Sequence, residues 1–159
     1  MMSKILLVLL LTSSPVWALN KTGRMGVGLS NQLVNDLPAL SLKIQQNRYF
    51  ALGGLLGFRS NEDYTIYGAG LRVFRTIFEE DLLNFYMAGT LVSLSYEENN
   101  KAKSGYQFDG TLGTEFHFER IESIGFSFEF GLSYNKGPEG RNFETLGNNF
   151  LKAAVHFYL

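Results

Sequence analysis

The stretch I-G-F-S-F-E-F-G-L-S-Y, residues 124–134, alternates large apolar residues with small or polar ones. The large set is Ile124, Phe126, Phe128, Phe130, Leu132 and Tyr134, and the set between them is Gly125, Ser127, Glu129, Gly131 and Ser133. Successive side chains of a β-strand point to opposite faces, so the segment predicts a strand with one aromatic face and one small, polar face. Apolar residues outside and small or polar residues inside are typical of a narrow barrel standing in lipid.

The same period of two recurs along the chain and predicts seven further strands. They cover residues 23–31, 39–46, 49–59, 64–75, 83–96, 106–118 and 149–159. Eight is an even number, as bacterial single-chain outer-membrane barrels require. We therefore expect an all-β fold: an eight-stranded antiparallel up-and-down transmembrane β-barrel after a cleaved signal peptide.

The segment 83–96 permits two registers. In one, Tyr86, Ala88, Val92 and Leu94 face outward; in the other, Phe85, Met87 and Leu91 do. Alternation alone leaves both open, because both sets are apolar.

The N-terminus has the pattern of a secretory signal peptide. Lys4 supplies a positive charge, residues 5–11 are apolar, and Val16-Trp17-Ala18 fits a small-residue cleavage site. The apolar run is far shorter than the ~20 residues that a membrane-spanning helix needs. We expect residues 1–18 to be the signal and residues 19–159 to form one barrel domain.

The composition excludes several classes of function. Of the 14 Lys and Arg residues, Lys4 belongs to the expected signal, which leaves 13 basic residues against 15 acidic ones. No basic stripe appears, so no nucleic acid is expected as a partner. The chain has no cysteine, which excludes disulfides and thiolate metal sites. Its 17 glycines and 14 phenylalanines, with 3 prolines, favour many strands over disorder.

The spacing between strands predicts the orientation of the barrel. The connections after the second and sixth strands are tight, whereas residues 97–104 and 135–147 form longer polar loops, and 76–81 form a charged turn. Outer-membrane barrels have short periplasmic turns and longer external loops. Both chain ends are therefore expected on the periplasmic side.

Charged residues within the strands fall on the inward face. They are Lys43, Arg72, Asp109, Glu115, Glu129 and Lys152, three cations against three anions. Arg72 is expected to lie between Glu115 and Glu129, with Lys43 and Lys152 close by. We interpret the set as a structural network that plugs the barrel, with an ion or proton gate as the alternative, because buried ionic groups must pair.

The chain ends in L-K-A-A-V-H-F-Y-L, with one apolar face made of Leu151, Ala153, Val155, Phe157 and Leu159. This resembles the C-terminal assembly signal of bacterial outer-membrane barrels. With the signal peptide and eight strands, the mature chain resembles small outer-membrane barrels of the OmpX and OmpA membrane-domain type. The resemblance is one of architecture, and it implies an outer-membrane location, with membrane lipid and the barrel-assembly machinery as partners of a monomer. Such signals usually end in Phe, whereas this chain ends in Leu159.

Residues that could carry catalysis are few. The two histidines, His117 and His156, are expected to point inward near the periplasmic ends of their strands, away from lipid A in the outer leaflet. His117 and Glu119 form a weak same-face pair, and packed interior histidines are the favoured interpretation. No catalytic residue, metal site or cofactor is expected.

These features predict a small integral outer-membrane protein with a structural or surface-interaction role. No large pore is expected, because wide aqueous channels need about 16 strands. The loop 135–147, from Asn135 to Gly147, is the candidate for binding a surface ligand. Two alternatives remain: a secreted, soluble, lipocalin-like barrel with its aromatic residues inward around a lipid, and a lipid A-modifying barrel enzyme.

Overall fold

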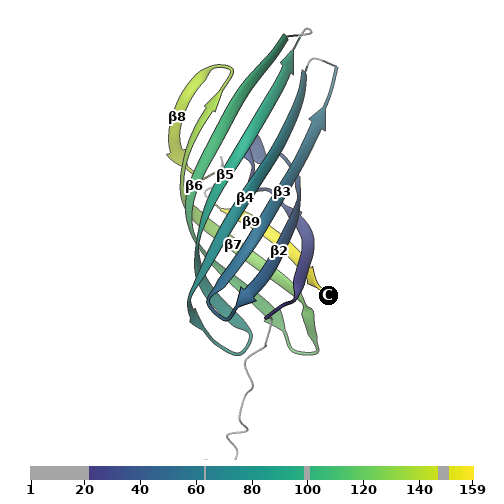
Figure 1. The fold of residues 1–159 in the computed structure, drawn as a ribbon, viewed down its shortest axis with the longest axis vertical. Coiled ribbons are helices and arrows are strands. Elements are labelled where there is room, and N and C mark those ends of the chain that lie inside the picture. The colour runs from purple at the N-terminus through teal and green to yellow at the C-terminus, as the bar shows by residue number, and fades with distance from the viewer. Residues whose placement is uncertain (1–21, 63, 99–100, 147–150) are drawn as a thin grey trace, which may run out of the picture.

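The computed structural model describes residues 22–62, 64–98, 101–146 and 151–159, and within them the chain is almost entirely β-strand (Figure 1). The signal peptide expected at residues 1–18 and the start of the last strand at residue 149 lie outside the described residues. The strands are β1 (Met25–Ser30), β2 (Ala39–Asn47), β3 (Phe50–Ser60), β4 (Tyr64–Glu79), β5 (Leu83–Glu98), β6 (Lys101–Phe118), β7 (Ile121–Gly137), β8 (Gly140–Thr145) and β9 (Lys152–Tyr158). A 3₁₀ turn, η1 (Val34–Asp36), joins β1 to β2. No helix in this part of the chain is long and apolar enough to cross a membrane.

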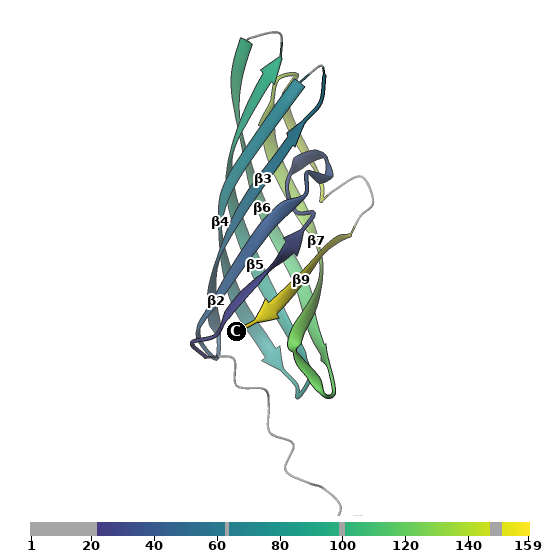
Figure 2. The ribbon, with the colours of Figure 1, turned by 90° about the vertical axis from the view of Figure 1, so that its right-hand side faces the viewer.

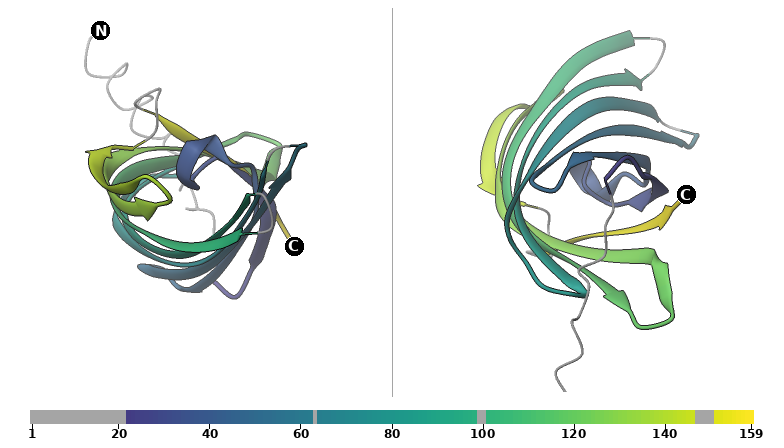
Figure 3. Two further views of the ribbon diagram at one scale, coloured as in Figure 1. Left: turned by 90° about the horizontal axis from the view of Figure 1, so that it is seen from above. Right: turned by 60° about the horizontal axis from the view of Figure 1, so that its bottom comes forward.

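The strands form one closed antiparallel barrel. Each strand from β1 to β7 pairs with the next along the chain, and β9 pairs with both β7 and β1, which closes the ring. The ring is visible from above in Figure 3. Closure leaves the lower barrel without a free strand edge, which is the arrangement the period-two pattern predicted.

The eighth position of the ring is shared by two strands. β9 pairs with the lower part of β7, from Ile124 to Glu129, while β8 pairs with its upper part, from Leu132 to Gly137. The sheet thus contains nine strands in an eight-stranded barrel, and β8 rises as a hairpin above β9 (Figure 1).

The expected long loops are mostly strand, which corrects three boundaries. β5 and β6 continue their ladder to the pair Glu98↔Lys101, within the expected loop 97–104. β7 and β8 occupy most of the expected loop 135–147, and β4 runs to Glu79 through the expected turn 76–81. The apolar alternation fades there because both faces of these extensions can be solvated, while the hydrogen-bonded backbone ladder continues.

The outward face of β4 differs from the expected one at its lower end. The structure leaves Arg75 inside the strand on that face, opposite Phe50 of β3 and Met87 of β5. The outward surface therefore carries an arginine, which corrects the expectation that the charged residues within the strands all face inward.

The faces of the barrel otherwise match the alternation. Large apolar side chains point outward, among them Leu71, Leu91 and Leu132, each at least half exposed. In β5 the second register is the correct one, because Tyr86, Ala88, Val92 and Leu94 are buried and Met87 and Leu91 are exposed. Both sets are apolar, so only the pairing of β5 with its neighbours decides between them.

The connection between β1 and β2 folds into the upper barrel. Leu33 and Leu37, which flank η1, are fully buried and pack against an interior cluster that includes Leu55, Val92 and Leu94. Figures 2 and 3 show this segment at the mouth of the barrel. Gly57 and Gly68 make room for it, since a Cβ at either position would collide with Leu33. Leu33 and Leu37 thus occupy part of the upper interior.

Closure between β1 and β9 depends on Gly28. A Cβ at this position would overlap the carbonyl oxygen of Val155. We expect Gly28→Ala to lower the free energy of unfolding by about 1–3 kcal/mol, the usual cost of overpacking. Urea titration of the refolded barrel measures the change.

Gly54→Ala is the matched control, because a Cβ there faces outward with its nearest atom, the Gly70 carbonyl oxygen, at 3.9 Å. Its unfolding free energy should stay within about 0.5 kcal/mol of the wild type. Equal midpoints for the two variants would contradict the role assigned to Gly28.

Candidate functional site

The six charged residues singled out in the sequence all lie inside the barrel. They are Lys43, Arg72, Asp109, Glu115, Glu129 and Lys152, and each is at most 7% exposed. They come from β2, β4, β6, β7 and β9, so only the closed ring brings them together. Water is largely excluded from this space, and the charges must therefore be compensated by protein groups.

Arg72 and Glu129 form the central ion pair. The Arg72 Nη2 atom lies 2.6 Å from Glu129 Oε2, and its Nε donates to Thr90 Oγ1 at 3.0 Å. Glu129 also accepts hydrogen bonds from the hydroxyls of Tyr86 and Thr111, both at 2.8 Å. Four strands are thereby connected across the lumen through one carboxylate.

A second pair, Lys43 with Glu115, lies beside the first. Lys43 Nζ is 2.8 Å from Glu115 Oε2, which also accepts a 2.7 Å hydrogen bond from the Tyr158 hydroxyl. Lys43 Nζ lies 4.8 Å from the ring centroid of Phe74, and the Arg72 guanidinium lies 4.6 Å from the same ring. Both cations thus contact the Phe74 ring, while Lys43 pairs with Glu115 and Arg72 pairs with Glu129. The expected sharing of Arg72 between Glu115 and Glu129 does not occur.

The other two charges lie nearer the upper end. Lys152 Nζ contacts Asp36 Oδ1 at 2.5 Å, which ties β9 to the segment that holds η1. Asp109 accepts a 2.6 Å hydrogen bond from Gln107 Nε2, and Gln107 also binds the backbone of Gln32 and Val34. Lys152 is the direct partner of Glu129 in the β7–β9 ladder, so its backbone lies beside the central ion pair as the sequence predicted. Its ammonium group, however, binds Asp36.

Both histidines are buried, in the part of the barrel where the chain ends. His156 Nε2 is 2.8 Å from Ser41 Oγ, and His117 Nε2 is 3.4 Å from Glu115 Oε1. Glu119 is exposed, so His117 turns to Glu115 rather than to Glu119. Among the described residues, no group of three or more His, Asp or Glu side chains is arranged to hold a metal ion.

Three partners in this network were absent from the sequence interpretation. Tyr158 has the same parity as Lys152 and His156, so the alternation of the last strand could have identified it as inward. Tyr86 depended on the undecided register of β5. Asp36 lies in a connection with positive φ at residues 35 and 36, where no periodic pattern exists to place it.

The C-terminal apolar set faces outward as a row. Leu151, Phe157 and Leu159 are exposed, and Ala153 and Val155 are half-buried on the same side of β9.

In the segment 135–147, Asn135 is buried and bound to Glu144 at 2.8 Å, while Phe143 is 70% exposed on β8. Part of the candidate ligand-binding segment is thus a well-bonded hairpin, and its outer side presents an aromatic ring.

The Arg72–Glu129 pair generates a stability prediction. Arg72→Met leaves a buried carboxylate without its cation, and we expect a loss of about 3–5 kcal/mol in unfolding free energy. The double variant Arg72→Met/Glu129→Gln should recover part of this loss, because no buried charge is then left uncompensated. Urea titration in detergent micelles measures all three proteins.

Arg48 provides the control for this prediction. It pairs with Glu79 at 2.7 Å, but its side chain is 62% exposed. Arg48→Met should therefore change the stability by no more than about 1 kcal/mol. If Arg72→Met were equally mild, the interior pair would have no role in holding the barrel together.

Comparison with known proteins supports the fold at the level of architecture. No family model matches the sequence, and no curated protein matches it. Among solved structures, the chain is similar to the N-terminal β-barrel domain of OprF from Pseudomonas aeruginosa, with a TM-score of 0.63 and 12% identity. The match covers 87% of this chain and 98% of that domain. The likeness shows that this chain has the fold of a closed, eight-stranded antiparallel barrel.

Proposed function

We propose that this protein is a small, monomeric, integral β-barrel of the bacterial outer membrane, with a structural or surface-interaction role. The observation that carries the proposal is the division of its faces. The outward surface is a broad apolar band, while the buried interior contains the ion pairs of Arg72 and Lys43. An apolar outer surface is stable in lipid. A charged side chain on that surface at mid-bilayer would cost about 2–4 kcal/mol, which is why the charges are expected inside.

The interior argues for a filled barrel without a large pore. An eight-stranded barrel is just wide enough for side chains to fill it. Leu33 and Leu37 occupy the upper part, and the Arg72 and Lys43 networks occupy the part below. The cavity beside η1, lined by Gln32, Gln107 and Ser133 among others, has a volume of only about 30 Å³. We propose that the network plugs the barrel and stabilises its closure.

The soluble lipocalin-like alternative fits the faces poorly. That class of barrel holds a lipid inside and presents polar side chains to water. Here Phe108, Phe157 and Leu71 are about half exposed or more, whereas Glu115 and Glu129 are at most 1% exposed. The lipid A-modifying alternative also lacks a supporting observation, because His117 and His156 are enclosed in the interior.

The surface-interaction role rests on the upper hairpins. The β5–β6 and β7–β8 ladders continue beyond the barrel ring, where β8 has only one paired edge among the described strands (Figure 1). Phe143 and Arg141 on β8 are exposed there. We assign any surface ligand to this hairpin, and the barrel-assembly machinery to the outward row of β9.

Membrane fractionation tests the proposal directly. We expect the protein in the membrane pellet, resistant to alkaline carbonate, and with faster mobility on a denaturing gel before boiling than after. Recovery in the soluble periplasm or the medium, without a heat-dependent shift, would reject it.

Leu71→Lys sharpens this test, because Leu71 is 71% exposed and lies well inside β4. In a membrane barrel the variant should lose about 2–4 kcal/mol of stability in lipid vesicles. In a soluble barrel the same exposed substitution should be close to neutral. Unchanged stability in vesicles would therefore favour the soluble alternative.

A further inference from the structure

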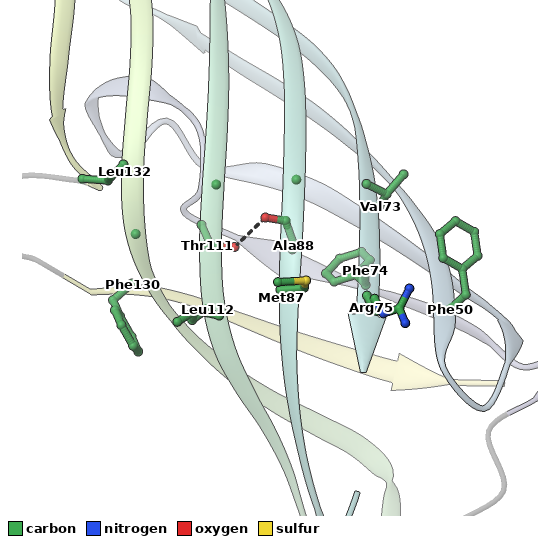
Figure 4. Close-up of a pocket in the computed structure, with 13 residues that line it drawn as sticks. Phe50, Val73, Phe74, Arg75, Met87, Ala88, Thr111, Leu112, Phe130 and Leu132 are labelled. Atoms are coloured by element: carbon green, nitrogen blue, oxygen red, sulfur yellow. Dashed lines mark hydrogen bonds between the residues drawn. The ribbon is translucent and has the colours of Figure 1, made fainter. Parts of the chain in front are cut away.

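An apolar groove of about 500 Å³ lies on the outer wall of the barrel (Figure 4). Gly89 of β5 and Gly110 of β6 form its floor, and we call it the glycine groove. Its walls are outward side chains of neighbouring strands: Val73, Met87, Leu112, Phe130 and Leu132. Phe50 and Arg75 lie at one end of it (Figure 4).

Nothing in the barrel itself requires glycine at the floor. Gly89 and Gly110 are direct partners in the β5–β6 ladder, which is regular at that point. A Cβ at Gly110 would meet no atom within 4 Å, and one at Gly89 would lie 3.5 Å from Val73, an ordinary contact. Glycine weakens a strand, and where no bulge explains it, it often marks the close approach of a ligand.

Arg75 has no acidic partner among the described residues. It lies on the outward face between Val73 and Ile77, both about half exposed. The nearby Arg48, by contrast, is paired with Glu79. An arginine on a lipid-facing surface is costly unless its guanidinium reaches an anion at the interface, and phosphate matches its donors well.

The groove and the arginine are arranged as one site. Arg75 is opposite Met87, while Gly89 lies two residues farther along β5, toward the middle of the barrel. Arg75 lies toward the end of the barrel where β9 ends. A lipid whose phosphate contacts Arg75 would therefore place an acyl chain over Gly89 and Gly110, nearer the middle of the barrel. Apolar walls with one polar group at the end are typical of ligand sites.

We propose that the glycine groove binds one phospholipid from the leaflet at the chain-terminal end, with its phosphate on Arg75 and an acyl chain over Gly89 and Gly110. The inference rests on the proposed membrane location. It assigns Arg75 a specific anionic partner rather than general contact with the bilayer.

The chain contains a matched groove without a cation. This second groove, of about 490 Å³, surrounds Gly54 and is lined by Leu40, Leu42, Leu56 and Leu71 among others, with no charged residue. It has a similar size and an outward glycine, so it separates the effect of filling a groove from the effect of losing the proposed site.

Titration with phosphatidylglycerol, followed by native mass spectrometry from detergent micelles, tests the proposal. Wild type, Arg48→Gln and Gly54→Leu should each retain one lipid. Arg75→Gln and Gly110→Leu should bind it about tenfold more weakly, the loss expected for one charge-assisted hydrogen bond or a filled groove. For the wild type, uncharged diacylglycerol should bind as weakly as phosphatidylglycerol binds to Arg75→Gln.

Equal lipid retention by all five proteins, or none by the wild type, would overturn the proposed site. The heat-dependent gel shift of the same samples separates this failure from that of the proposed function. A wild-type barrel that shifts and sediments with membranes but binds no lipid refutes the groove alone. A wild-type protein that shows no gel shift, does not sediment with membranes and binds no lipid refutes both the groove and the proposed membrane location.

Discussion

The hydrogen-bonded closure between β1 and β9 is the constraint on which the rest of the structure depends. It joins the first strand to the last, so every strand in the lower barrel has two neighbours. In a bilayer, where no water can satisfy free backbone groups, a closed ring is the only sheet that can span. The close approach of Gly28 to Val155 shows how tightly the two ends of the chain are joined.

Closure also creates the interior and determines its chemistry. The lumen of eight strands is narrow, so inward positions hold glycine, serine and side chains that have a partner across the space. Arg72 and Glu129 form an ion pair across it, and the hydroxyls of Tyr86 and Thr111 donate further hydrogen bonds to the Glu129 carboxylate. Such a network costs desolvation of both charges, which good geometry and added hydrogen bonds offset. The network therefore stabilises the barrel only when all of its members are in place.

The alternation of residue types identified most inward and outward positions correctly, including the burial of Lys43, Arg72 and Glu115. It failed where its physical basis is absent. In β5 both faces carry apolar residues, so parity was undecided. Above the barrel ring both faces meet solvent, so the pattern fades although the strands continue. The segment around Asp36 has no regular period, and its contact with Lys152 was therefore not foreseen.

By itself, the sequence determined the eight-stranded antiparallel barrel and the inward face of the six charged residues that it singled out, because side-chain parity is a local property of extended backbone. Only the tertiary structure decided which charges meet, that Leu33 and Leu37 enter the barrel, and that Arg75 lies at the end of an apolar groove. These relations join residues far apart in the chain. They depend on the register of every ladder around the ring, and a one-residue change in register would reverse the faces of a strand.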